Sequence, residues 1–104
     1  MLFNPECEHC QKETERFLSM PEIFKKAQLV MISMESLEKT KLFSQRYQLE
    51  KNPCIYIGKD FKRFFIGYFM AQTIPVLAFY DQKKSLLFYK QGDVTEKEIQ
   101  EKIK

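Results

Sequence analysis

The order of apolar and amphipathic segments constrains the fold of this chain more than any other feature. Leu2–Phe3 are typical of the end of a strand that the start of the chain cuts short, and a helix is expected over residues 7–20, closed by Pro21. The continuous apolar run at residues 29–34 predicts a strand that is buried on both faces, as in a parallel sheet. A strand, a helix and a second parallel strand require a right-handed crossover.

The middle of the chain is expected to add two helices and a short extended segment. Ser36 is placed to cap a helix that runs through Tyr47. Asn52-Pro53 is expected to interrupt regular secondary structure, and residues 54–57 are expected to form a short extended piece after it. Asp60 is placed to cap a further helix. Aromatic residues repeat there at helical spacing and give one heavily apolar face: Phe61, Phe64, Phe65 and Tyr68.

The last third of the chain predicts a hairpin and a covering helix. Residues 76–80 and 86–90 are expected to be strands on either side of a polar turn. Thr95 and Glu98 match a capping box at the start of the last helix. The whole order predicts an α/β domain: a mixed sheet of about four strands, the first of them truncated, with helices on both faces.

The composition restricts the classes of function. The chain has 104 residues, which suits one domain, and 44% hydrophobic with 30% charged residues is typical of a globular protein. The net charge of +3 is spread along the chain and is too small to indicate binding of nucleic acid. The longest apolar runs are far too short to span a bilayer. Three cysteines are too few for a disulfide scaffold.

Cys7 and Cys10 form a Cys-x-x-Cys pair just after a predicted strand and at the start of a predicted helix. A helix N-terminus offers unpaired N–H groups and the positive end of the dipole, both of which favour a thiolate. The spacing places the second thiol one turn later, close enough to resolve a mixed disulfide. We therefore expect Cys7 to be the exposed nucleophile and Cys10 the buried resolving thiol.

Two residues near the cysteine pair, and the third cysteine, need separate interpretations. His9 is either a positive group that stabilises the Cys7 thiolate or an exposed residue that merely fits the turn. Glu13 shares the helix face of Cys10, so its carboxylate points toward the sheet, either to move the proton of the resolving thiol or to pair with Arg16 or Lys12. Cys54 is most simply a small buried apolar residue.

The segment from Phe3 to Glu13 resembles the active-site segment of the TlpA/ResA-like branch of thioredoxin-fold proteins. Thr73-Ile74-Pro75, before the strand at residues 76–80, resembles the cis-proline loop of that family, and the likeness covers essentially the whole chain. It implies one thioredoxin-like domain over residues 1–104. The first strand of the family is longer than residues 1–3, so the sequence is expected to be a fragment that lacks its N-terminal part.

The resemblance implies a bacterial thiol–disulfide oxidoreductase that needs no cofactor or metal. By the same resemblance, the enzyme is expected to act on protein thiols and disulfides and to receive electrons from a redox donor protein. Its expected location is outside the cytoplasm, in the periplasm, with a membrane tether outside this fragment. A cytoplasmic location is the alternative. The resemblance also implies that Cys7 is the nucleophile, Cys10 the resolver and Glu13 the acid–base glutamate. His9 replaces the commoner Pro, so the direction stays open between reductase, oxidase and isomerase. Ile74 and Pro75 are implied to bind an extended substrate strand.

Two other functions remain open from the sequence. The chain could be a redox-inactive module of the same fold that binds an extended peptide beside Pro75. It could also be a metal carrier that uses Cys7, His9 and Cys10. The structural alternatives for the cysteine pair are a static disulfide and a zinc half-site, with Cys7, His9, Cys10 and Cys54 as the candidate ligands. A tetrahedral zinc site needs four ligands. Neighbouring His9 and Cys10 are expected to point to different sides of a helix, which argues against their binding the same ion.

Overall fold

A mixed sheet forms the centre of the structure, a computed structural model that describes residues 1–92 and 94–103. Within these residues the sheet has five strands in the order β3-β2-β1-β4-β5. The strands and helices are β1 (Leu2–Phe3), α1 (Glu8–Leu18), β2 (Leu29–Ser33), α2 (Leu37–Tyr47), β3 (Ile55–Lys59), α3 (Phe64–Tyr68), β4 (Val76–Tyr80), β5 (Leu86–Gln91) and α4 (Glu96–Lys102). A short 3₁₀ turn, Pro21–Lys25, follows α1, and another, Leu49–Lys51, follows α2. A third, Phe61–Arg63, precedes α3. No described helix is long and apolar enough to cross a membrane.

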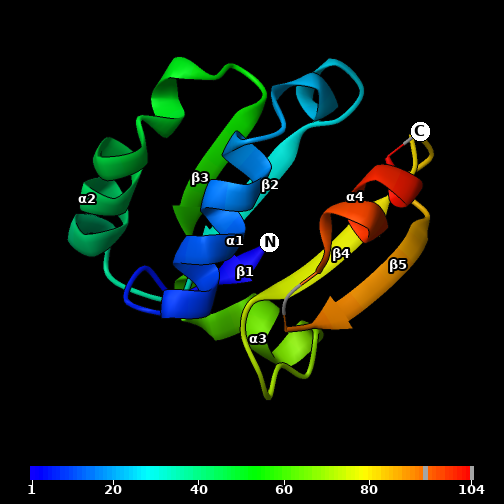
Figure 1. The fold of residues 1–104 in the computed structure, drawn as a ribbon. Coiled ribbons are helices and arrows are strands. Elements are labelled where there is room, and N and C mark those ends of the chain that lie inside the picture. The colour runs from blue at the N-terminus through cyan, green and yellow to red at the C-terminus, as the bar shows by residue number, and fades with distance from the viewer. Residues whose placement is uncertain (93, 104) are drawn as a thin grey trace.

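The strand directions bring several loops to one edge of the sheet. β1 pairs parallel with β2, and β2 pairs parallel with β3, whereas β4 runs antiparallel to β1 and to β5. The ends of β1, β2 and β3 therefore lie at the same edge as the start of β4 and the end of β5 (Figure 1). We call this the carboxyl edge of the parallel strands.

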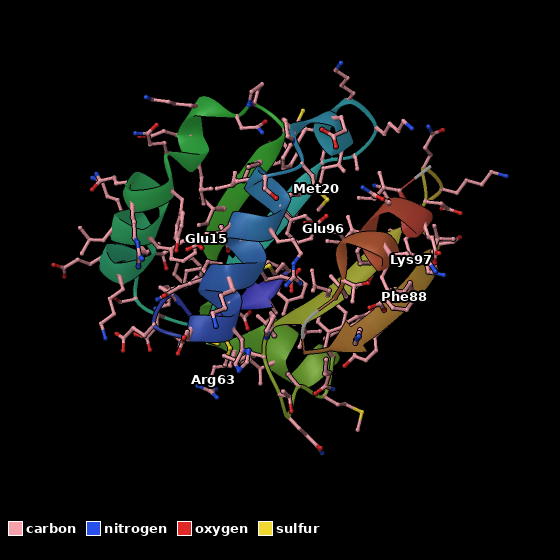
Figure 2. All side chains as sticks on the ribbon, viewed as in Figure 1. Glu15, Met20, Arg63, Phe88, Glu96 and Lys97 are labelled. Carbon is pink, nitrogen blue, oxygen red and sulfur yellow. The ribbon has the colours of Figure 1, made fainter. Side chains whose placement is uncertain are left out.

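One face of the sheet is covered by α1, α2 and α4. In Figure 1, α1 crosses in front of the centre of the sheet, with α2 on one side and α4 on the other. A buried cluster joins the C-terminal end of α1 and the turn after it to β4 and α4: Phe17, Met20, Ile23, Leu77, Val94 and Ile99. Figure 2 labels Met20, just beyond the C-terminal end of α1. Burial of these side chains supplies the main force that holds the helices on the sheet.

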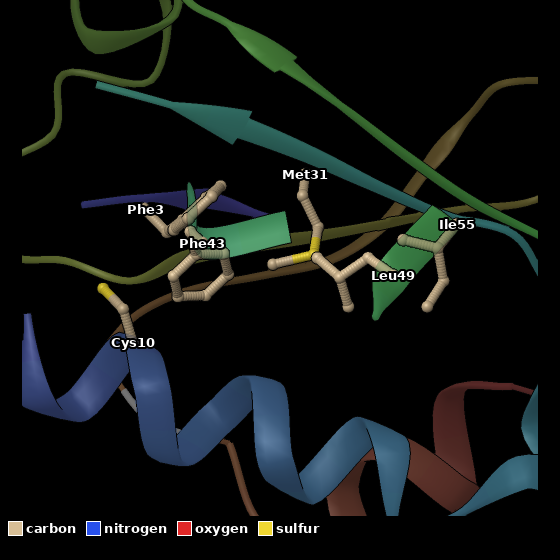
Figure 3. Packing of buried hydrophobic residues seen from close by; sticks show 6 residues of the cluster. All are labelled: Phe3, Cys10, Met31, Phe43, Leu49 and Ile55. Atoms are coloured by element: carbon tan, nitrogen blue, oxygen red, sulfur yellow. The ribbon is translucent and has the colours of Figure 1, made fainter. Parts of the chain in front are cut away.

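A second cluster lies between α1, α2 and the parallel strands. Its members are Phe3, Cys10, Met31, Phe43, Leu49 and Ile55. Figure 3 shows Cys10 rising from α1 toward the rings of Phe3 and Phe43, which lie against each other with centroids 4.8 Å apart. Because Cys10 belongs to this core, the first turn of α1 has a fixed position relative to the sheet.

The sheet has five strands rather than about four over the described residues, because the extended piece expected at residues 54–57 is a full edge strand, β3. β3 pairs with β2 over its whole length, from Leu29 opposite Ile55 to Ser33 opposite Lys59. The sequence signal was weak because Gly58 has low strand propensity and Asn52-Pro53 stands close by. The backbone hydrogen bonds to β2 decide the conformation instead.

The strand at residues 29–33 is not buried on both faces as predicted. Val30 keeps 51% of its surface exposed. Tyr89 pairs with Ala78, beside the core residue Leu77, so its side chain points away from the core clusters. Phe69, just after α3, stacks on Tyr89 at 6.0 Å, so α3 covers the second face near β5. Helices do lie on both faces, but the second face has only this short one over the described residues.

Local capping follows the sequence closely. The Ser36 hydroxyl accepts a hydrogen bond from the Lys39 N–H at 3.2 Å, and Thr95 and Glu98 form the expected capping box. The Asp60 carboxylate accepts from the N–H of Phe65 at 3.1 Å. The helix that follows is nevertheless short, because Lys62 and Arg63 adopt left-handed backbone conformations with φ of 60° and 56°. The aromatic face of α3 is largely exposed.

Candidate active site

Cys7 is the N-cap residue of α1, and Cys10 lies one turn further along. The backbone N–H of Cys10 donates a hydrogen bond to Cys7 Sγ at 3.3 Å. The sulfur thus occupies the place that a Ser or Asp oxygen takes in an ordinary helix cap. Unpaired N–H groups and the positive end of the helix dipole favour an anion at that place. The geometry suits a thiolate at Cys7.

The loop before Cys7 is held by short-range hydrogen bonds. The Cys7 N–H donates to the Asn4 carbonyl at 3.0 Å, and the Glu6 N–H donates to Asn4 Oδ1 at 2.9 Å. The Gln11 side chain donates to the Pro5 carbonyl at 2.9 Å, and Lys39 of α2 forms an ion pair with Glu6. No local sequence pattern indicated the contact with α2, because Glu6 and Lys39 are far apart along the chain.

The two thiols differ in accessibility. Cys7 is partly exposed, while Cys10 is completely buried in the cluster shown in Figure 3. A substrate in solution can therefore reach Cys7 directly. Cys10 is positioned to react with a sulfur already attached to Cys7, as a resolving thiol must.

Glu13 is almost completely buried on the face of α1 that carries Cys10. Its Oε2 accepts a hydrogen bond from the Val94 N–H at 3.2 Å and lies 3.2 Å from Arg16 Nη1. Arg16 also donates to the Val94 carbonyl. The predicted inward position is confirmed, and of the two partners named in the alternative interpretation, Arg16 is the one that pairs with Glu13. The acid–base role of Glu13 stays a prediction.

Val94 is a part of this site that the sequence did not indicate. It lies between β5 and α4, 81 residues from Glu13. Its contribution is a backbone N–H and a carbonyl, which every residue but proline carries. No local pattern could have marked it, because only the packing of α4 against α1 brings it to Glu13.

His9 and Cys10 do point to different sides of α1, since His9 is exposed and Cys10 is buried. Cys54 donates to the Phe24 carbonyl at 3.4 Å and is partly buried. It precedes β3 and so lies at the opposite edge of the sheet from Cys7. Among the described residues, no three His, Cys, Asp or Glu side chains gather in a way that could hold a metal ion.

Ile74 and Pro75 lie beside the loop that carries Cys7. The Ile74–Pro75 peptide bond is cis, the geometry that the resemblance implied. Leu2 pairs with Val76 in antiparallel register, so Pro75 falls next to Phe3. Ile74 and Cys7 both pack against the cluster that contains Cys10. The tertiary structure thus brings together residues that are about 65 positions apart in the sequence.

The strand order, the crossover helices and a Cys-x-x-Cys pair at the start of α1 define a thioredoxin-like fold. One solved structure similar to this chain is that of StoA from Bacillus subtilis, with a TM-score of 0.68 and 20% sequence identity. The match covers 96% of this chain and 76% of StoA. At this identity the likeness establishes the fold alone. No family model and no curated protein matches the chain.

Proposed function

We propose that this protein is a thiol–disulfide oxidoreductase that exchanges disulfides with protein substrates through Cys7 and Cys10. One observation carries the proposal: Cys7 caps α1 with its partly exposed sulfur, which accepts the N–H of the buried Cys10 at 3.3 Å. A helix N-terminus activates the attacking thiol, and burial keeps the second thiol for resolution. The thioredoxin-like fold supports this assignment.

In the reductive direction, the Cys7 thiolate attacks one sulfur of a substrate disulfide. A bond forms between Cys7 Sγ and that sulfur, the substrate S–S bond breaks, and the other substrate sulfur leaves and takes up a proton. Cys10 then loses its proton and attacks Cys7 Sγ, which forms the internal disulfide and releases the second substrate thiolate. The substrate is reduced by the pair of electrons that Cys7 and Cys10 lose, and a redox donor protein restores the dithiol.

The neighbouring residues have supporting roles in this proposal. Glu13 takes the proton that Cys10 releases, because both side chains are buried on the same face of α1 and one turn apart. His9, on the exposed side of the first turn, stabilises the Cys7 thiolate when it carries a proton. The Ile74 backbone, held beside Cys7, pairs with an extended segment of the substrate.

The substrate class also indicates a compartment. Protein disulfides form and persist in oxidising compartments and are rare in the cytosol. We therefore place the protein outside the cytoplasm, as the resemblance implied. Fractionation of cells that express the natural gene tests this location.

The test of the proposed function starts from the reduced protein and glutathione disulfide. Mass spectrometry should show the internal Cys7–Cys10 disulfide as the end product. Cys10→Ser should stop at a glutathione adduct on Cys7, because the resolving thiol is missing. Cys54→Ser is the matched control and should react as the parent does. The assignment fails if Cys10 in a Cys7→Ser protein reacts faster than Cys7 in a Cys10→Ser protein.

A further inference from the structure

We propose that an exposed aromatic and basic surface around α3 docks an acidic, apolar polypeptide segment of the protein that the dithiol acts on. We call it the α3 surface and define it by Phe61, Lys62, Arg63, Phe64, Tyr68 and Met70. The inference rests on the proposed function in one respect only, namely that the docked polypeptide is its substrate.

The α3 surface exposes more apolar area than a solvent-facing helix needs. Phe64 keeps 59% of its surface exposed, Tyr68 63% and Met70 77%. The rings of Phe64 and Tyr68 stack at 5.9 Å with an angle of 20° between them, so they present a flat apolar platform. Contiguous exposed apolar groups of this kind mark interaction sites. Aromatic and Met side chains are also enriched in interfaces.

The charge around this platform is of one sign. Residues 59–91 hold six Lys and Arg and two Asp, a net charge of +4, whereas the whole chain carries +3. Both aspartates are engaged by backbone groups. Asp60 accepts from the N–H of Phe65 and Ile66, and Asp81 accepts from the N–H of Lys83 and Ser85. Lys90 is paired with Glu98, outside this range. The other five Lys and Arg side chains leave the outward charge basic, and this complements an acidic partner.

The location connects the α3 surface to the dithiol. α3 follows β3, and Cys7 follows β1, so both lie at the carboxyl edge of the parallel strands. Figure 2 shows Arg63 below the start of α1. A surface hollow of about 720 Å³ runs from Tyr68 and Met70 past Tyr89 to Tyr80 and Leu86, beside the turn between β4 and β5. Since that turn lies at the opposite edge of the sheet from Cys7, the hollow receives the part of a bound segment that leads away from its cysteine.

A polypeptide fits these observations better than a lipid surface. Basic and aromatic side chains are also typical of contacts with anionic membranes. However, the α3 surface shares an edge of the sheet with Cys7, and this favours a partner that delivers a sulfur to the site. A polypeptide segment rich in Glu or Asp and in aromatic residues has the matching chemistry.

Binding is measured without any redox step. The probe is a short fluorescein-labelled peptide of alternating Glu and Phe with a central Ser, and its comparison peptide has Lys in place of Glu. Anisotropy should show that the acidic peptide binds more tightly, by about tenfold or more at low salt. Lys62→Glu/Arg63→Glu and Phe64→Ser/Tyr68→Ser should each remove most of that binding.

The matched control is Lys41→Glu/Leu42→Ser on the exposed side of α2, where Leu42 is also largely exposed. It makes the same kinds of change on another surface and should leave binding intact. Thermal melts by circular dichroism verify that each variant is folded. Since all the replaced side chains are exposed, their effect on stability should be small.

A second readout separates this proposal from the proposed function. The same acidic peptide, with Cys joined to glutathione in place of the central Ser, should react faster with the reduced parent than with either α3 variant. Glutathione disulfide alone should react equally with all of them. Equal binding of acidic and basic peptides, or parent-like binding by both α3 variants, overturns the proposal. It is also overturned if the α3 variants lose only association with anionic vesicles, or only self-association. A parent that binds the peptide but exchanges no disulfide contradicts the proposed function instead.

Discussion

The Glu13 carboxylate accepts a hydrogen bond from the backbone N–H of Val94 at 3.2 Å. This contact ties the helix that carries both cysteines to the segment that leads into α4. Arg16 completes the arrangement, since its guanidinium reaches both Glu13 and the Val94 carbonyl. A buried carboxylate thus has a structural task as well as the proposed chemical one, and the two can be measured separately.

The structural task is tested by Arg16→Met. We expect the free energy of unfolding to fall by about 1–3 kcal/mol, because the buried Glu13 carboxylate loses its cationic partner. Chemical denaturation measures the change. Lys12→Met is the control on the same helix. It removes the exposed ion pair with Glu8 and should change the free energy of unfolding by less than about 0.5 kcal/mol. Equal effects of the two variants would show that Glu13 does not depend on Arg16.

The chemical task is tested by Glu13→Gln. The Gln amide oxygen can still accept the Val94 N–H, so we expect a modest loss of stability of about 1 kcal/mol. The rate of exchange should fall by about tenfold or more, and one ionisation should disappear from its pH profile, because the amide cannot take the proton of Cys10. Glu15→Gln, on the exposed side of α1, should leave the profile unchanged. An identical pH–rate profile for Glu13→Gln would leave Glu13 with its structural task alone.

The redox potential follows from which form of the pair is stabilised. The helix N-terminus, the Cys10 N–H and a protonated His9 all favour a thiolate at Cys7 and hence the reduced form. A stabilised reduced form makes the couple more oxidising. We expect a potential above that of thioredoxin, about −270 mV, and below that of the strongest periplasmic oxidant, about −120 mV. Equilibration with glutathione mixtures and counting of thiols gives the value.

His9→Pro is the variant that tests the contribution of the histidine to that potential. Loss of the imidazole should make the couple more reducing, so the potential should fall. A potential of the parent well below that of thioredoxin, together with no shift in His9→Pro, would show that His9 is only an exposed residue of the first turn.

The capping box of α4 predicts a pH dependence of stability. Hydrogen bonds from the Thr95 backbone and from Lys90 lower the pKa of Glu98 below its ordinary value of 4.5. A carboxylate with a lowered pKa stabilises the folded state above its ordinary pKa, and that contribution is lost as the pH falls through the lowered value. As the pH is lowered below about 4.5, the melting temperature should therefore decrease. The decrease should be smaller in Glu98→Gln than in the parent. Glu101→Gln, an exposed glutamate of the same helix, should follow the parent.

The sequence by itself determined the local features of this protein. Helical spacing placed Glu13 on the face of Cys10, and side-chain caps such as Ser36 and Thr95 marked helix starts, because these depend on residues only three or four positions apart. The Cys-x-x-Cys pair after a short strand likewise placed the candidate site at the start of α1. These signals sufficed for the fold class and for Cys7, Cys10 and Glu13, but not for Val94.

Only the tertiary structure decided which distant groups meet. Gly58 and the nearby Pro53 weakened the sequence signal for β3, so only a short extended piece was expected there. The full edge strand forms because β2 offers it backbone hydrogen-bond partners. The exposure of Val30 depends on which faces the helices cover, and the pairing of Glu13 with Val94 depends on how α4 packs against α1. Such contacts arise from burial and backbone hydrogen bonding between remote segments, and no periodicity along the chain records them.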